Sequence, residues 1–269
     1  MDLSSFIWVF ILLAALQPVL QKRLHEVLRQ RKIDELQRKR GSRVITLVHR
    51  QETMSLLGFP LMRYIDVQDS EQILRVIDAT DPDQPIDLIL HTPGGMVLAA
   101  TQISRALIKH RGPVRVLVPH YAMSGGTLLA LAADQIIMNE HAVLGPIDPQ
   151  IEGLPAASIL AAAATKPVNE LDDMTLVHAD VAQKAIIQIT DEAAELLASH
   201  MEPKLARKLA KKLASGHWTH DYPISASMAR DLGLPVSTNM PPEVMQMMRL
   251  YPQPANKMGG VEYLPKNGG

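Results

Sequence analysis

Residues Val114–Ala133, VRVLVPHYAMSGGTLLALAA, predict a buried strand, a glycine turn and a helix of small residues. Ser124 lies in the turn and is followed by two glycines, so its hydroxyl lies uncrowded beside the N–H groups that open the helix. Such a place suits a nucleophile whose attack creates an oxyanion. Serine is also a common N-cap and Gly-Gly is common in turns, so this stretch alone leaves both interpretations open.

A second glycine turn lies about 30 residues upstream, where strand 86–90 runs into His91-Thr92-Pro93-Gly94-Gly95 and helix 96–110 follows. In successive βα units such turns lie at the same edge of the sheet. We therefore expect the backbone N–H groups of Gly94-Gly95 to lie near Ser124, and a side chain at Gly95 to block the carbonyl of a substrate. The other predicted elements are strands 43–48, 114–118 and 135–138, helices 69–79, 127–133 and 176–197, and a hairpin or flap within 54–65. This order predicts an α/β fold with a largely parallel sheet.

Composition narrows the class of protein. The chain has 269 residues, 47% of them hydrophobic, so it can bury a substantial core. Its net charge of −1 argues against a general nucleic-acid binder. It has no cysteine, which excludes disulfides and thiolate metal sites. We expect no metal and no other cofactor.

The N-terminus predicts attachment to a membrane. Residues 3–20, LSSFIWVFILLAALQPVL, form an apolar run near the lower length limit of a membrane span. Residues 21–43 carry nine Lys and Arg against three acids, which gives +6. Because basic residues follow the span and none precede it, we expect the remainder of the chain to face the cytoplasm. The predicted units are a transmembrane anchor at 1–20, a basic juxtamembrane helix at 21–42, the main domain at 43–255 and a loose tail at 256–269.

The paired turns carry a resemblance to a known group. Strand–TPGG–helix followed by strand–MSGG–helix is similar to the Clp-type peptidases and signal peptide peptidase A, which share a crotonase-like spiral fold. Residues 141–150, HAVLGPIDPQ, and 218–236, WTHDYPISASMARDLGLPV, more closely resemble the serine dehydrogenase proteinase family. The resemblance covers about residues 43–255.

The resemblance implies roles for individual residues. Ser124 corresponds to the nucleophile, and Gly95 and Gly125 to the donors of the oxyanion hole. Clp-type peptidases place a catalytic histidine about 25 residues after the serine, where this chain has Asp148 and no histidine. The serine dehydrogenase proteinases are described as using serine, aspartate and histidine in that chain order, and Asp148 and His220 fit it. The chemistry requires only that an imidazole reach the hydroxyl and an acid orient the imidazole.

A lysine is the competing base. Relatives of signal peptide peptidase A use a lysine several tens of residues after the serine, and here Lys184 and Lys166 are the candidates. Lys184 falls in a predicted helix among apolar residues, and partial burial would help it to lose its proton. We rank the histidine base above the lysine.

These observations favour a membrane-anchored serine peptidase that cleaves peptide or protein substrates through an acyl-enzyme. By resemblance it is expected to form a homo-oligomer. A crotonase-type acyl-CoA enzyme, in which the same N–H pair polarises a thioester, and a non-catalytic membrane scaffold are the alternatives.

Overall fold

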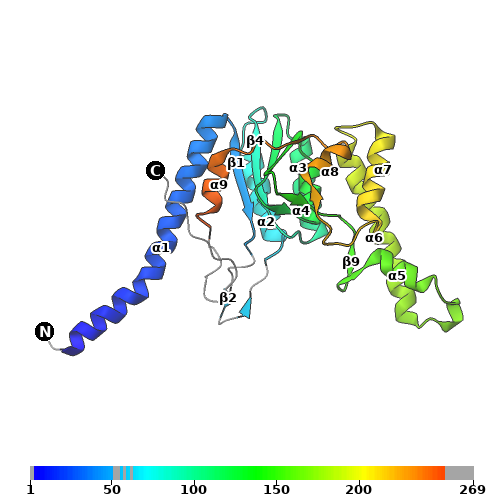
Figure 1. Cartoon of the computed structure of the whole chain (residues 1–269), viewed down its shortest axis with the longest axis horizontal. Helices are drawn as coiled ribbons and strands as arrows, with labels where there is room; N and C mark the ends of the chain where they lie inside the picture. The colour runs from blue at the N-terminus through cyan, green and yellow to red at the C-terminus, as the bar shows by residue number, and fades with distance from the viewer. Residues whose placement is uncertain (1–2, 51–54, 57–58, 61–62, 252–269) are drawn as a thin grey trace.

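Five parallel strands form the central sheet of the computed structural model, which describes residues 3–50, 55–56, 59–60 and 63–251 (Figure 1). Their order across the sheet is β1-β4-β5-β7-β12, and every neighbouring pair is parallel. The strands are β1 (Arg43–Val48), β4 (Ile86–His91), β5 (Val114–Val118), β7 (Gln135–Met138) and β12 (Val236–Ser237). The predicted α/β fold with a largely parallel sheet is confirmed.

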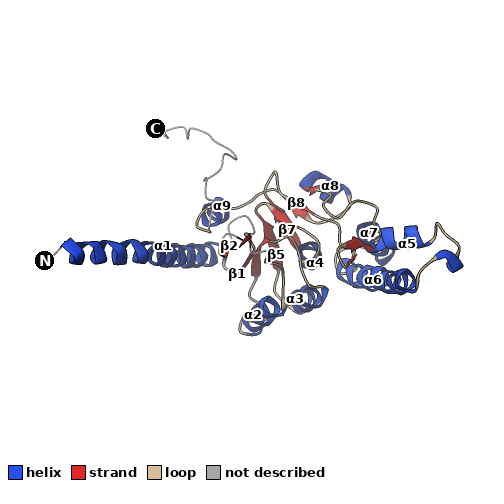
Figure 2. Ribbon diagram, turned by 90° about the horizontal axis from the view of Figure 1, so that it is seen from below, coloured by secondary structure: helices blue, strands red, loops and turns tan. Residues whose placement is uncertain are grey.

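Helices cover both faces of this sheet, and the apolar strands pack against each. Along β4, Leu88 and Leu90 contribute to one core cluster, whereas Ile89 contributes to the other. This alternation follows from the two-residue period of a strand. In Figure 2, α2 (Val67–Asp78) and α3 (Val97–Lys109) lie on one side of the sheet, and α9 (Pro242–Met248) lies on the other. Strands buried on both faces need continuous apolar runs, which explains sequences such as VRVLV.

Short strands and further helices complete the chain. A small sheet has the order β11-β8-β6, and two pairs, β9 with β10 and β2 with β3, are antiparallel. The short strands are β2 (Ser55–Leu56), β3 (Phe59–Pro60), β6 (Tyr121–Ala122), β8 (Val143–Leu144), β9 (Gln150–Ile151), β10 (Leu154–Pro155) and β11 (Ile224–Ser225). The remaining helices are α1 (Leu3–Arg40), α4 (Gly125–Leu131), α5 (Ala156–Ala163), the 3-10 helix η2 (Val168–Glu170), α6 (Asp173–Leu197), α7 (Pro203–Ala214) and α8 (Ala226–Asp231).

The N-terminal residues form one helix rather than two units. Helix α1 runs without a break from Leu3 to Arg40, so residue 20 is no boundary in the backbone. Within the part of the chain whose residues are described, no helix is long and apolar enough to cross a membrane. The predicted transmembrane anchor is therefore not confirmed. The side chains of residues 3–15, which make up most of the apolar run, lie outside the described part, as does the predicted tail at 256–269.

The second half of α1 is an integral part of the domain. Leu36 is buried in the core cluster that contains Ile89, and Lys39 bonds to Glu243 of α9. The C-terminal part of the predicted juxtamembrane helix at 21–42 thus packs on the domain. Apolar residues of α1, such as Leu36, cover one face of the sheet. Their helical spacing in the sequence predicts an apolar face but not the surface that this face covers.

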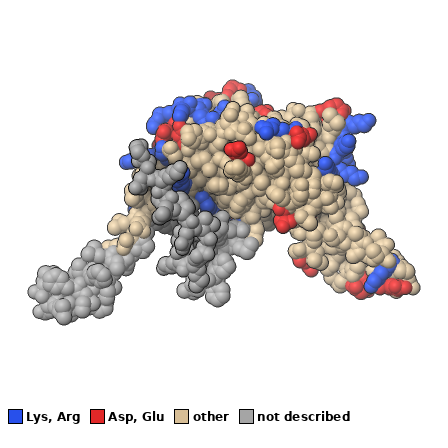
Figure 3. Space-filling model, viewed as in Figure 1, with Lys and Arg blue, Asp and Glu red and all other residues tan. Residues whose placement is uncertain are grey.

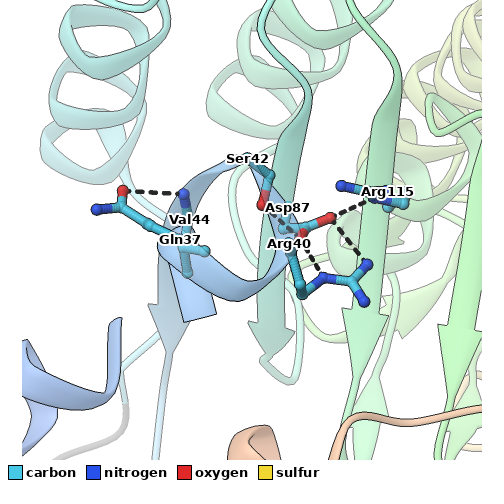
Figure 4. A network of polar contacts seen from close by, with 6 residues as sticks. All are labelled: Gln37, Arg40, Ser42, Val44, Asp87 and Arg115. Atoms are coloured by element: carbon cyan, nitrogen blue, oxygen red, sulfur yellow. Dashed lines mark hydrogen bonds and ion pairs between the residues drawn. The ribbon is translucent and has the colours of Figure 1, made fainter. Parts of the chain in front are cut away.

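A buried carboxylate joins α1 to the sheet (Figure 4). Asp87 of β4 accepts hydrogen bonds from Arg40 and Arg115, each with its Nε at 2.5 Å, and from the Ser42 hydroxyl at 2.7 Å. The Asp87 side chain is only 1% exposed. Burial of a charge is costly unless it is paired, and here two guanidinium groups supply the pairing. This network fixes the end of α1 against the edge of the sheet where β4 and β5 begin.

Charged side chains gather away from the middle of the molecule. In Figure 3, Lys and Arg cluster near the end of α1 and over α7, and the central face between them carries few charges. Helix α7 buries an alanine and leucine face, which includes Ala206, Leu209 and Leu213, and its lysines and arginine lie on the opposite face. Helices α5 and α6 project from the body on the side opposite to α1 (Figure 1).

Candidate active site

The two glycine turns meet at one edge of the sheet, as expected. The N–H of Met123 donates to the Thr92 carbonyl at 3.0 Å, which joins the turn after β4 to the turn after β5. The glycines approach so closely that a Cβ built on Gly94 would lie 2.7 Å from Cβ of Ser124. A Cβ built on Gly125 would lie 3.4 Å from the Gly95 nitrogen. Glycine is needed here because the two backbones touch.

Ser124 has a strained backbone at the start of α4. Its φ of 50° and ψ of −117° fall in a region that residues with a side chain rarely adopt. The N–H of Gly126 bonds to the Met123 carbonyl at 2.7 Å, which closes the turn around the serine. Strain of this kind persists only where the surroundings enforce it, and it is common at catalytic positions.

Two backbone N–H groups of the glycine turns have no partner within their own bridge or helix. Ile65 forms a parallel bridge with Gly95, donating to the Gly94 carbonyl and accepting from Met96, each at 2.8 Å. In such a bridge the N–H of the central residue, Gly95, points away from the partner strand. Gly125 is the first residue of α4, so its N–H has no partner within the helix. Two such groups side by side can hold an oxyanion.

A side chain at Gly95 has a different consequence from the one expected. Its Cβ would lie 2.3 Å from the nitrogen and the oxygen of Ile65. Gly95 therefore has no room for a side chain at all, because the Ile65 backbone would have to move first. A variant at this position would disturb the Ile65–Gly95 bridge as well as block the substrate's carbonyl.

An acid–base pair lies across from these turns. Asp148 follows β8 in the loop whose Ile147 N–H bonds to Leu213 of α7, and His220 lies in the loop after α7. Nδ1 of His220 is 2.9 Å from Oδ1 of Asp148, and the other carboxylate oxygen accepts from Nε2 of Gln150 at 2.8 Å. The Asp148 side chain is 1% exposed and that of His220 is 33% exposed. The structure thus brings together two residues that are 72 positions apart in the sequence.

The pair raises the affinity of the imidazole for a proton. The hydrogen bond to Asp148 raises the pKa of His220 above its ordinary 6.5, although partial burial of the ring acts in the opposite direction. Because Nδ1 is engaged with the carboxylate, Nε2 is the nitrogen that remains for proton transfer.

Ser124 and His220 line the same cavity, which holds about 250 Å³. Its wall also contains Gly95, Gly125, Asp148 and Gln150. The apolar part of the lining consists of Tyr64, Pro93, Val97, Leu128, Ile147, Pro149 and Ile189. The five residues predicted for the site are therefore found around one cavity. The sequence had indicated no role for the other eight lining residues, among them Tyr64 and Gln150.

Neither lysine candidate reaches this cavity. Lys184 is exposed on α6 and bonds to Asp180 at 2.5 Å, one helical turn away. Lys166 is exposed in the loop before η2. Lys184 therefore lacks the partial burial that would help a lysine base, because its position on α6 faces solvent while Ile189 of the same helix reaches the cavity.

Other polar features do not form a comparable site. A groove of about 790 Å³ lies between α2 and α3, but its threonine, Thr80, donates to the Val76 carbonyl. His91 is 1% exposed, and burial lowers its pKa to about 3, so it stays neutral. Over the residues that the structure describes, no group of three His, Cys, Asp or Glu is placed to hold a metal ion.

Comparison with known sequences gives a family. The model of the family described as ClpP-like SDH-type serine proteinase matches residues 1–268. Two uncharacterized proteins of Methanocaldococcus jannaschii are 51% and 47% identical to this chain, each over 98% of it and over 92% and 90% of their own lengths. The probable protease SohB of Haemophilus influenzae is 35% identical over 82 residues, which are 29% of this chain and 23% of that protein.

Three chains are among the solved structures to which this protein is similar. A serine-to-alanine mutant of the 1510-N membrane-bound stomatin-specific protease is 18% identical, with a TM-score of 0.47, over 68% of this chain and 79% of that one. A lysine-to-alanine mutant of the same protease, in complex with a substrate peptide, is 21% identical, with a TM-score of 0.46, over 68% and 75%. ClpP1 from Listeria monocytogenes is 14% identical, with a TM-score of 0.47, over 76% and 95%.

Proposed function

Because this chain belongs to the family of ClpP-like SDH-type serine proteinases, we propose that it hydrolyses peptide bonds with Ser124 as the nucleophile. His220 acts as the general base and Asp148 orients it. The N–H groups of Gly95 and Gly125 form the oxyanion hole. The observation that carries this proposal is the His220–Asp148 hydrogen bond in the wall of the cavity that Ser124 also lines.

The reaction divides into two steps. Nε2 of His220 accepts the hydroxyl proton while Oγ of Ser124 bonds to the carbonyl carbon, and the two backbone N–H groups stabilise the negative oxygen. His220 then gives the proton to the leaving amine as the C–N bond breaks, which leaves an acyl-enzyme. Water attacks this ester with the same base, and Ser124 recovers its proton. A short rotation of the side chains has to bring Ser124 and His220 into contact, because no hydrogen bond joins them in the described structure.

The cavity wall favours an apolar side chain beside the scissile bond. Leu128, Ile147 and Ile189 line it and are each less than 5% exposed. Val97 and Tyr64 also line it and are more exposed. A charged side chain would lose hydration there, and the cavity offers it no charged partner besides His220 and Asp148, which are already paired with each other.

Covalent labelling tests the proposal. A peptidyl phosphonate with a leucine-like side chain should label the protein at Ser124, and the Ser124→Ala variant should stay unlabelled. The same phosphonate with an aspartate-like side chain should label about tenfold more slowly or less, because its charge would be desolvated. Labelling of Ser104, a buried serine on α3, or no labelling of wild-type protein that cleaves peptides would remove Ser124 from this role.

We also propose that residues 3–20 attach the protein to a membrane, with the peptidase domain in the cytoplasm. The apolar run and the basic residues after it support this, by the positive-inside rule. Protease added outside intact cells should leave the domain whole, and lysis should expose it to digestion. Digestion in intact cells would contradict this orientation, and recovery in the soluble fraction would contradict attachment. Homo-oligomer formation stays a prediction.

A further inference from the structure

A second chain of a hydroxyl, an imidazole and a carboxylate is bonded to the Gly94-Gly95 turn. Nδ1 of His49 is 3.0 Å from Oγ1 of Thr92, and Nε2 of His49 is 3.3 Å from Oδ2 of Asp69. Thr92 is fully buried and His49 is 3% exposed. Neither Thr92 nor His49 lines the cavity, so this chain is separate from Ser124, His220 and Asp148.

We propose that Asp69, His49 and Thr92 form a positioning relay that holds the Gly94-Gly95 turn in the shape required of the oxyanion hole. This inference rests on the function proposed above for Gly95. The three residues come from three elements, since His49 follows β1, Thr92 follows β4 and Asp69 lies in the first turn of α2.

Thr92 is the link to both glycine turns. Its side-chain oxygen accepts the N–H of Gly94 at 3.2 Å, which fixes the residue next to Gly95. Its backbone carbonyl accepts the N–H of Met123, the residue before Ser124. The orientation of one threonine therefore sets the distance between the two donors of the oxyanion hole.

The polarity of the relay follows from its ends. The Asp69 carboxylate is held by the capping box of α2, where it accepts the Asp66 N–H at 3.1 Å. Its contact with Nε2 of His49, at 3.3 Å, calls for a hydrogen on that nitrogen, and the tautomer with its single hydrogen there has an acceptor at Nδ1. In that tautomer the Thr92 hydroxyl donates to Nδ1 at 3.0 Å, in preference to the Gly94 carbonyl at 3.4 Å, and its lone pairs accept the Gly94 N–H. The imidazole thus favours the Thr92 rotamer in which the hydroxyl oxygen accepts the Gly94 N–H.

The first test compares matched threonine variants. Thr92→Val keeps the shape and removes the hydroxyl, whereas Thr92→Ser keeps the hydroxyl. Thr80→Val is the control, because Thr80 is a buried threonine at the end of α2 that bonds only within that region. We expect Thr92→Val to lower kcat about 10- to 100-fold with KM changed less than about threefold, since a misplaced donor weakens transition-state binding. Thr92→Ser should recover most of kcat, and Thr80→Val should retain it.

The second test needs no catalysis. Amide hydrogen exchange at Gly94 should become faster in Thr92→Val and in His49→Phe than in the wild type. His49→Asn places a polar atom where Nδ1 lies in the wild type, so this variant should preserve slow exchange. Unchanged exchange at Gly94 in Thr92→Val and His49→Phe, or wild-type kcat in folded Thr92→Val, would overturn the relay. If the wild-type protein cleaves no peptide while exchange at Gly94 responds as expected, the proposed function fails and the relay remains as a structural device.

Discussion

The His220→Ala variant is expected to lose at least about 10⁴-fold in kcat on a peptide substrate, because Ser124 would have no base. The structure gives this expectation its strength, since the imidazole is bonded to a buried carboxylate and lines the cavity of the serine. KM should change little, because the His220 ring forms only one part of the cavity wall, and most of that wall consists of apolar side chains and glycine backbone. Steady-state kinetics with single-turnover acylation would separate the two quantities.

The lysines provide the matched controls. Lys184→Ala and Lys166→Ala remove exposed cations that lie outside the cavity, so kcat should stay within about twofold of the wild type. Added imidazole should partly restore His220→Ala, because the substitution leaves room beside Asp148, and it should leave Ser124→Ala inactive. If Lys184→Ala abolished turnover while His220→Ala retained it, a serine–lysine dyad would replace the histidine mechanism.

The parts of the fold that the sequence predicted are those in which local pattern and burial agree. Strand 114–118 is buried on both faces, and its bounds in the structure are those that its apolar run predicts. Helix α2 shows the limit of this reasoning. The sequence predicts this helix over 69–79, but Asp66 is its N-cap and Asp69 closes the capping box from the first turn. Carboxylates three residues apart are hard to assign from sequence because either one can accept the free N–H groups.

The same distinction holds for the site. Ser124, Gly95 and Gly125 stand in turns between predictable elements, so topology places them together. The approach of His220 to Asp148 depends on two loops whose sequences have no periodicity. Only the resemblance to the serine dehydrogenase proteinases pointed to this pair. The His49–Thr92 contact was missed altogether. Its one signal in the sequence is that His49 directly follows strand β1, just as Thr92 directly follows β4. Only the parallel register, which pairs Val48 with His91, makes this meaningful.

Replacing Asp148 by asparagine should lower kcat by about 10⁴-fold, close to the effect of removing the base, although the shape is retained. In the wild type one carboxylate oxygen accepts from Gln150 and the other faces Nδ1 of His220. The asparagine oxygen would keep the Gln150 amide as its donor, so its NH₂ group would face Nδ1. That ring nitrogen would then accept a hydrogen bond, which places the ring proton on Nε2 and leaves no lone pair for the hydroxyl of Ser124.

The pH dependence gives this variant a second signature. Asp148 raises the pKa of His220 above 6.5, so wild-type activity should fall on the acid side of that raised value, where the base is protonated. In Asp148→Asn the residual activity should fall at a lower pH, because the main cause of the raised pKa is gone and burial of the ring remains. Asp221→Asn is the matched control, since it removes the carboxylate next to His220 in sequence, a smaller cause of the raised pKa, and should keep kcat near that of the wild type.

Stability should follow the same linkage with a definite sign. A group whose pKa is raised in the folded state stabilises that state fully below its unfolded pKa, and the contribution disappears as the pH rises through the folded value. Asp148→Asn should therefore lower the free energy of unfolding more at about pH 5.5 than at about pH 9 relative to the wild type, as urea denaturation would show. A larger loss at the higher pH, or an acid limb that does not move, would mean that the His220–Asp148 hydrogen bond does not set the protonation of the base.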